Sequence, residues 1–161
     1  MKFNLEDLLD NHSDGIYFVD NHRRIIYWNK AAELITGHCS AEVVGSSCAD
    51  NILVHVDDQG RQLCTGMCPL AHTIKDCRPR RSEVFLHHKD GHRVPVLIRV
   101  SPLRDETGEV VGAAEMFTEI SAQHELTNRV QELEYRIRID ELTGLPNRAY
   151  LESEITSCFR E

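Results

Sequence analysis

The sequence predicts an α+β domain in which small helices pack on one face of an antiparallel sheet. Two β-type runs, at residues 15–19 and 24–28, lie near the N-terminus, and three more follow between residues 83 and 118. Short helical patterns separate the two groups, and within each group tight polar turns join neighbouring strands. Strands that are grouped and connected by hairpins favour an antiparallel sheet over alternating parallel units.

A short amphipathic helix is expected to open the chain. Three leucines at i, i+3 and i+4 spacing follow Asn4, which can cap the helix, and the pattern stops at the polar residues 11–15. The polar turn at residues 20–23 then joins the first two strands into a hairpin. A second helix is expected between the cap Asn29 and Gly37, because glycine readily takes the left-handed conformation that ends a helix.

Turn-rich segments are expected over residues 40–58, and a third helix follows them. Pro69 suits its first turn, where the missing N–H would be unpaired anyway, and the pattern runs to about Asp76. At 100° per residue, Cys77 shares the apolar face of this helix and is expected to be buried. His72 lies on the opposite face and is expected to meet solvent.

The clearest strand pattern is the alternation of apolar residues from Val94 to Val100. Within it, Pro95 indicates an edge or a bulge nearby, because proline cannot donate to the ladder. Turns at residues 89–91 and 105–108 connect this run to a strand on either side. The last three strands therefore form a meander.

Beyond Ile120 the pattern changes to that of a coiled coil. Apolar residues spaced four, three and four apart form a seam of about two heptads: Leu126, Val130, Leu133 and Ile137. Charged residues surround this seam, as expected for a solvated helix that pairs with a partner. Since an isolated helix of this length is marginal in water, we expect a homodimer through the seam. The alternative is a helix packed back onto its own domain.

Composition and charge exclude several classes of protein. The 161 residues include 18 Lys and Arg against 26 Asp and Glu, a net charge of -8, which argues against nucleic acid as a partner. No stretch approaches the roughly 20 apolar residues of a membrane-spanning helix, and the N-terminus is too acidic for a secretory signal. A cytoplasmic location is expected. The six cysteines are then expected to be mostly reduced thiols.

The first 120 residues resemble the PAS family. Several segments carry the resemblance: the two opening strands and the helix after them, the closing meander, and a Glu-Ile-Ser where PAS domains commonly have Asp-Ile-Thr. They are residues 15–20, 26–33, 36–37, 87–96, 101–105, 108–112 and 119–121. The resemblance implies a five-stranded antiparallel sheet with small helices. It also implies a sensory role, in which a small ligand, a metal or a redox change shifts the sheet.

Residues 140–148, Asp-Glu-Leu-Thr-Gly-Leu-Pro-Asn-Arg, resemble the start of GGDEF domains, the diguanylate cyclases that condense two GTP molecules into cyclic di-GMP. The Gly-Gly-Asp/Glu-Glu-Phe signature of that family does not occur in the chain. We therefore expect no catalytic residues and no GTP-condensing activity here, and a diguanylate cyclase as the parent protein. The residues from Arg148 onward are expected to be frayed or to form a lone helix.

The two resemblances imply three parts: a PAS sensor domain at residues 1–120, a signalling helix at 121–139 and the truncated start of a GGDEF domain at 140–161. The expected function is that of the signal-sensing input module of a diguanylate cyclase, which regulates cyclic di-GMP synthesis through a dimeric helix. Two alternatives stay open. The domain could be a ligand-free dimerisation module, or it could sense metal or redox changes through its cysteines.

Cys64 and Cys68 carry the most suggestive chemistry. A tight turn between them would bring both sulfurs to the entrance of the third helix, and two thiolates are half of a zinc or iron site. Cys48 and His55 are the preferred further ligands. Three intervening residues are a looser spacing than the two of most zinc sites, so redox-active or inert structural thiols remain alternatives.

No cofactor can be assigned from motifs. The Cys-x-x-Cys-His of covalent haem attachment and the Asn-Cys-Arg-Phe-Leu-Gln of flavin light sensors do not occur in the sequence. Three histidines, at positions 87, 88 and 92, fall on a hairpin that is expected to be solvated. The identity of any small-molecule ligand therefore stays open.

Overall fold

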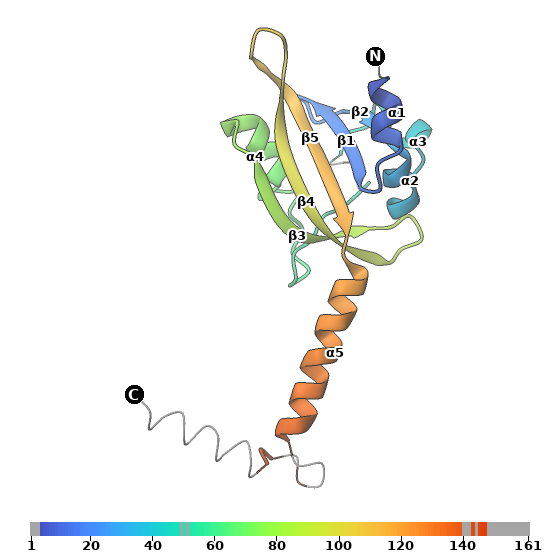
Figure 1. Cartoon of the computed structure of the whole chain (residues 1–161). Helices are drawn as coiled ribbons and strands as arrows, with labels where there is room; N and C mark the ends of the chain where they lie inside the picture. The colour runs from blue at the N-terminus through green and yellow to red at the C-terminus, as the bar shows by residue number, and fades with distance from the viewer. Residues whose placement is uncertain (1–3, 49, 51, 140–142, 144, 148–161) are drawn as a thin grey trace. The chain divides into compact units, whose positions relative to one another are not determined.

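Five antiparallel strands form one sheet in the spatial order β2-β1-β5-β4-β3 (Figure 1). The computed structural model describes residues 4–48, 50, 52–139, 143 and 145–147. The strands are β1 (Gly15–Asp20), β2 (Ile25–Trp28), β3 (Arg80–His87), β4 (Arg93–Arg104) and β5 (Val110–Glu119). Hairpins join β1 to β2 and β3 to β4 to β5, and β1 pairs with β5 to close the two groups into one sheet. The predicted α+β class is confirmed.

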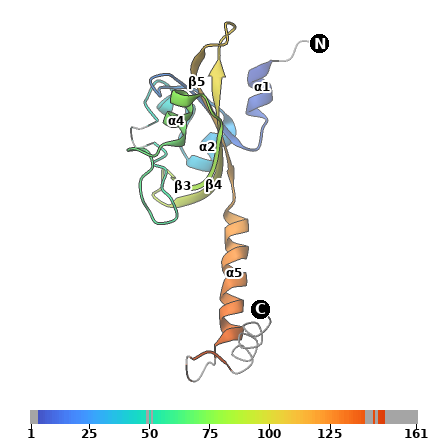
Figure 2. The same ribbon diagram turned by 90° about the vertical axis from the view of Figure 1, so that its left-hand side faces the viewer.

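Four short helices accompany the sheet: α1 (Leu5–Asp10), α2 (Lys30–Thr36), α3 (Ser40–Val43) and α4 (Pro69–Asp76). Their ends follow the expected chemistry. The Asn4 side chain accepts a hydrogen bond from the Glu6 N–H of α1, and Gly37 ends α2 in the left-handed conformation at φ 76°. Figure 2 shows α2 and α4 on one side of the sheet and α1 on the other.

The position of α1 differs from the prediction that all helices lie on one face. Leu9 of α1 lines a shallow apolar hollow together with Phe18 and Met116, which alternate with the core-facing residues of β1 and β5. A six-residue helix has only a small apolar face, and Leu5 and Leu8 remain exposed. The helix covers one end of the outer sheet surface and contributes nothing to the main core.

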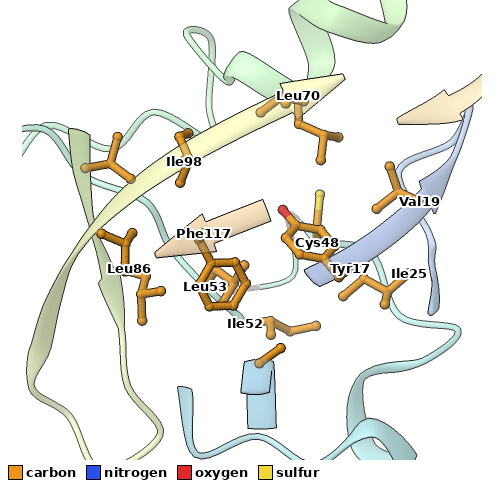
Figure 3. Close-up of a cluster of buried hydrophobic side chains, with 14 of the residues drawn as sticks. Tyr17, Val19, Ile25, Cys48, Ile52, Leu53, Leu70, Leu86, Ile98 and Phe117 are labelled. Carbon is orange, nitrogen blue, oxygen red and sulfur yellow. The ribbon is translucent and has the colours of Figure 1, made fainter. Parts of the chain in front are cut away.

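The main core lies between the sheet and the α2–α4 side (Figure 3). The predicted alternation in β4 is confirmed, because Val94, Val96, Ile98 and Val100 are all buried. Tyr17, Trp28 and Phe117 form the aromatic centre, with ring centroids 5.3 to 6.3 Å apart. Packing of this kind identifies the single Trp28 as a core residue.

Asn29 joins three elements through one buried side chain. Its Oδ1 accepts hydrogen bonds from the N–H groups of Ile16 (2.8 Å) and Ala32 (2.9 Å), so it caps α2 and fixes β1 at once. Its Nδ2 donates to the carbonyls of Leu9 (2.9 Å) and Asp14 (3.0 Å). All four hydrogen-bonding positions of the amide are therefore used, which explains how an asparagine is stable in the core.

Two predictions about single residues need correction. Cys77 is exposed, because α4 ends at Asp76 and Cys77 takes the left-handed conformation at φ 60°, which turns it away from the helix face. Pro95 does not mark an edge, because β4 is an internal strand of the sheet. Proline is tolerated there because the pairing of β4 with β5 ends at Val96 and Glu119. Pro95 lies one residue beyond this last pair, where the ladder with β5 needs no further N–H donor.

Replacing Tyr27 with Phe is expected to loosen α1 with little effect on the sheet. The half-buried Tyr27 hydroxyl donates a 3.0 Å hydrogen bond to Asp10 at the end of α1, and its loss costs about 1 kcal/mol. Hydrogen exchange should show faster exchange of the Leu8 and Asn11 amides, which bond within α1. Tyr135→Phe, at an exposed tyrosine of the C-terminal helix, is the matched control. Unchanged exchange in α1 would contradict the prediction.

The C-terminal helix α5 (Ser121–Arg138) confirms the predicted helix after Ile120. The chain divides into two compact units, Met1–Ser121 and Ala122–Glu161, and most of α5 belongs to the second. Three seam residues are exposed in the single chain: Leu126 (67%), Val130 (46%) and Leu133 (46%). The side chain of Ile137 and the predicted tail from Arg148 lie outside the described residues.

Candidate functional site

Three polar side chains meet in the core on the α2–α4 side of the sheet: Tyr17, His55 and Glu115, together called the core polar cluster. Tyr17 and Glu115 are register partners on the adjacent strands β1 and β5, so their side chains project from the same face. His55 approaches from the loop segment before α4. Each is almost fully buried, with 4% of His55 and 1% of Glu115 exposed. Buried polar groups of this kind require an explanation.

The backbone around His55 is held in a strained conformation. Val54 lies in the left-handed region at φ 40°, which is rare for a β-branched residue. Its carbonyl accepts a 2.7 Å hydrogen bond from Arg93, and Val56 exchanges two 2.9 Å backbone hydrogen bonds with Phe85 of β3. The segment is thus tied to the sheet on both sides of His55. These bonds fix the imidazole in its inward orientation.

Within the cluster, two buried atoms have no hydrogen-bond partner: His55 Nε2 and Glu115 Oε1, which lie 3.5 Å apart. Burial raises the pKa of Glu115 to about 8, although a hydrogen bond from Tyr17 acts in the opposite direction. Burial, with a smaller contribution from Arg93, lowers the pKa of His55 to about 4. Near pH 6 both groups are therefore neutral, and their contact is not an ion pair.

Three thiols surround the core polar cluster. Burial, and secondarily the neighbouring Cys68 and Glu115, raise the pKa of Cys48 to about 12. Burial also raises the pKa of Cys64, against the effect of a hydrogen bond from the His55 backbone N–H to its sulfur. Figure 3 shows the Tyr17 hydroxyl beside the Cys48 sulfur. Cys48 and Cys64 are thus protonated thiols at neutral pH.

Of the four predicted ligands, Cys48, Cys64 and Cys68 lie near one another, and His55 lies 3.5 Å from Glu115. Over the ranges that are described, no three His, Cys, Asp or Glu side chains are grouped so that they could hold a metal ion as they stand. Binding of zinc or iron stays a prediction, and so does redox chemistry of Cys64 and Cys68. His72 is exposed, as expected, and its Nε2 lies 3.2 Å from the Gly66 carbonyl oxygen.

Glu115 was missed as a site residue, although the sequence contains an indication of it. In residues 110–118 the core-facing positions are every second residue, and Glu115 falls between the buried Ala113 and Phe117. A carboxylate in the buried phase of a strand is unusual and is a reason to suspect function. Tyr17 could be paired with it only after the β1–β5 register was known.

Comparison with known families identifies the fold. A PAS fold model matches residues 9–125, which is more than half of the chain. The chain belongs to the PAS family. The PAS fold predicted from the sequence is therefore confirmed, and the core polar cluster lies inside a PAS sensory domain.

Individual relatives are distant. The probable diguanylate cyclase DgcE of Escherichia coli K12 is 24% identical over 158 residues, which cover 96% of this chain but only 13% of that protein. A PAS domain of a Colwellia psychrerythraea protein has a TM-score of 0.60 at 23% identity and covers 72% of this chain and 93% of its own. The light-state dimer of the fungal blue-light photoreceptor Vivid has a TM-score of 0.56 at 24% identity, with 68% and 79% covered.

The solved structures show the fold alone, and Vivid shows in addition that a PAS relative forms a dimer. No helix among the described residues has the length and apolar character needed to span a membrane. The polar α5 fits this result, because Glu132, Arg129 and Arg136 form ion pairs along its surface.

Proposed function

We propose that this chain is the signal-sensing input module of a diguanylate cyclase and regulates cyclic di-GMP synthesis through a dimeric output helix. The observation that carries the proposal is the extent of the likeness to DgcE. The PAS match ends at residue 125, whereas the likeness to that cyclase covers 96% of the chain and so includes the motif at residues 140–148. A PAS domain followed by this motif is the arrangement expected of a sensor that controls a GGDEF domain.

The path from sensor to output is short in sequence. Glu115 of the core polar cluster lies on β5, which ends at Glu119, and α5 begins at Ser121. The Ser121 hydroxyl donates a 2.7 Å hydrogen bond to Glu119 at this junction. A change at Glu115 that alters β5 would therefore reach the start of α5 within six residues. A signal that binds at the cluster can act as a switch only if the two arrangements of the helix pair bind it with different affinity.

The core polar cluster is the proposed point of input. It combines two unpartnered polar atoms with two buried thiols, Cys48 and Cys68, and the half-buried Cys64, so a small polar ligand, a metal or a thiol oxidant would each find groups to act on. A ligand-free dimerisation module would have no use for such a cluster, because unpaired buried polar atoms cost stability. The cluster thus favours sensing over dimerisation alone.

The catalytic step itself is assigned to the parent protein. The chain contains no Gly-Gly-Asp/Glu-Glu-Phe signature and spans 13% of the length of DgcE. We therefore propose that GTP condensation takes place in a GGDEF domain beyond the motif at residues 140–148. In this view the 161-residue chain sets the activity of that domain and has none of its own.

A chimaera tests the proposal. With this chain joined ahead of a GGDEF catalytic domain, Leu133→Asp should lower cyclic di-GMP production about tenfold or more, because loss of the helix pair separates the catalytic domains. Glu115→Gln should change production at saturating GTP if the core polar cluster is the input, whereas Glu109→Gln in an exposed turn should not. Equal activity of all four proteins would refute the input role. An effect of Leu133→Asp alone would support the ligand-free dimerisation module.

A further inference from the structure

The turn between β3 and β4 docks against the end of α2 (Figure 1). The Lys89 N–H donates a 2.8 Å hydrogen bond to the carbonyl of Thr36, and the Lys89 ammonium lies 2.7 and 2.8 Å from the two carboxylate oxygens of Glu42 in α3. The His88 ring fills the space beside Gly37, because a Cβ atom at Gly37 would lie 2.7 Å from the ring Cε1. These contacts, together called the hairpin latch, hold the turn on the two helices.

The hairpin latch depends on a His88 ring without a proton on Nδ1. This nitrogen accepts a 3.1 Å hydrogen bond from the Asp90 N–H, so the proton of the neutral ring lies on Nε2. Only 15% of the His88 side chain is exposed, although its hairpin was expected to be solvated. A proton added on Nδ1 would face the Asp90 N–H. The ring would then have to turn, away from Gly37, toward the Asp90 carboxylate 3.6 Å from Nδ1.

Protonation would also bring like charges together. The His92 ring stacks on the His88 ring, with centroids 4.3 Å apart and an angle of 21° between the ring planes. Two imidazolium rings at this separation repel each other. The other charged and titratable residues around the pair come from β3, β4, the hairpin turn, the α2–α3 connection and α3: His87, Arg93, Lys89, Asp90, His38, Cys39 and Glu42. Of these, only Asp90 and Glu42 are carboxylates, and Glu42 is already paired with Lys89.

His38 adds a third imidazole that favours the neutral form. Burial, and secondarily the charge of Lys89, lower the pKa of His38, while Glu42 acts in the opposite direction. The contribution of His38 to stability is therefore complete at neutral pH and is lost as the pH falls. Its carbonyl accepts a 3.1 Å hydrogen bond from Nε1 of the core residue Trp28, so this ring cannot move away from the patch freely.

We infer that the hairpin latch is an acid-sensitive conformational switch, which is closed while His88 is neutral and opens when His88 takes up a proton beside His92. Histidine is the side chain that changes its charge between pH 5 and 8, so the switch is expected to respond in that range. Opening would free the end of β3, where the His87 N–H donates a 2.7 Å hydrogen bond to the Leu53 carbonyl. The inference concerns the PAS domain alone and does not rest on the cyclase assignment.

Amide hydrogen exchange of the 161-residue chain, followed by NMR, tests the inference. The Lys89 amide reports on the latch because it donates to the Thr36 carbonyl. After correction for the intrinsic effect of pH on exchange, its protection factor should fall about tenfold or more from pH 7.5 to pH 5.5. The amide of Ile98, on the internal strand β4, should keep its protection at both pH values.

Two further readouts connect the change to the histidines. In the wild type, the Gly37 and Lys89 amide resonances should shift with the same midpoint pH as the ring resonances of His88. His92→Gln removes one ring of the stack at an exposed position, and His22→Gln, at an exposed histidine of the β1–β2 turn, is the matched control. The fall in Lys89 protection should be at least about threefold smaller in His92→Gln than in the control.

Four outcomes would each overturn the inference. They are equal protection of the Lys89 amide at both pH values, a midpoint different from that of the His88 ring, an undiminished fall in His92→Gln, and loss of Ile98 protection together with that of Lys89. The last outcome would mean that acid unfolds the whole domain and not the latch. None of these measurements depends on cyclic di-GMP.

Discussion

Replacing Leu133 with Asp is expected to abolish dimerisation of the chain. Leu133 is an exposed leucine of α5, with 46% of its surface accessible in the single chain, and it is a central residue of the seam. In a symmetric pair the change buries two carboxylates opposite each other and removes two leucines. The dissociation constant should rise at least about 100-fold, which corresponds to about 3 kcal/mol. Static light scattering of the purified chain measures the loss of dimer mass.

The matched control for this change is Tyr135→Asp. Tyr135 is also an exposed apolar residue of α5, with 65% of its surface accessible, but it lies at an f position on the side opposite the seam. The variant should retain the dimer. Equal dimer mass for both variants would show that the seam is not intermolecular, whereas monomers for both would indicate that the helix itself had unfolded.

The sheet and its connections could be predicted from the sequence because they depend on local patterns. The alternation around Ile98, the cap Asn29 and the end signal Gly37 each act within a few residues, and the structure has them as expected. Cys77 was assigned to the wrong environment because a helical pattern does not show where the helix stops. One residue beyond the last turn, the periodicity no longer applies.

The candidate site was predicted only in part, because it depends on long-range pairing. Cys64 and Cys68 share a local motif and could be grouped from the sequence alone. The loop that carries His55 meets β5 only through the tertiary fold, and the pairing of Tyr17 with Glu115 depends on a register between strands about 100 residues apart. Hydrophobic periodicity predicts which face of a strand is buried, but it does not predict which strands are neighbours.

Stability of the wild-type chain is expected to decline as the pH rises from 6.5 to 8, and Glu115→Gln should remove that decline. Glu115 has its pKa raised from 4.5 to about 8 by burial, so its stabilising contribution is complete below pH 4.5 and is lost as the pH rises through 8. His55 has its pKa lowered from 6.5 to about 4, so its contribution is complete above pH 6.5 and is lost as the pH falls through 4.

The two contributions have opposite signs and overlap between pH 4.5 and 6.5, where the folded chain holds one proton more on Glu115 and one fewer on His55 than the unfolded chain. Their slopes cancel there, and only the Glu115 slope remains above pH 6.5. Over the interval to pH 8 the free energy of unfolding should fall by about 2 kcal/mol.

Urea unfolding at pH 6.5 and 8.5 measures this fall for the wild type, Glu115→Gln and the exposed control Glu109→Gln. A decline that persists in Glu115→Gln would show that another group is its source and would contradict the prediction.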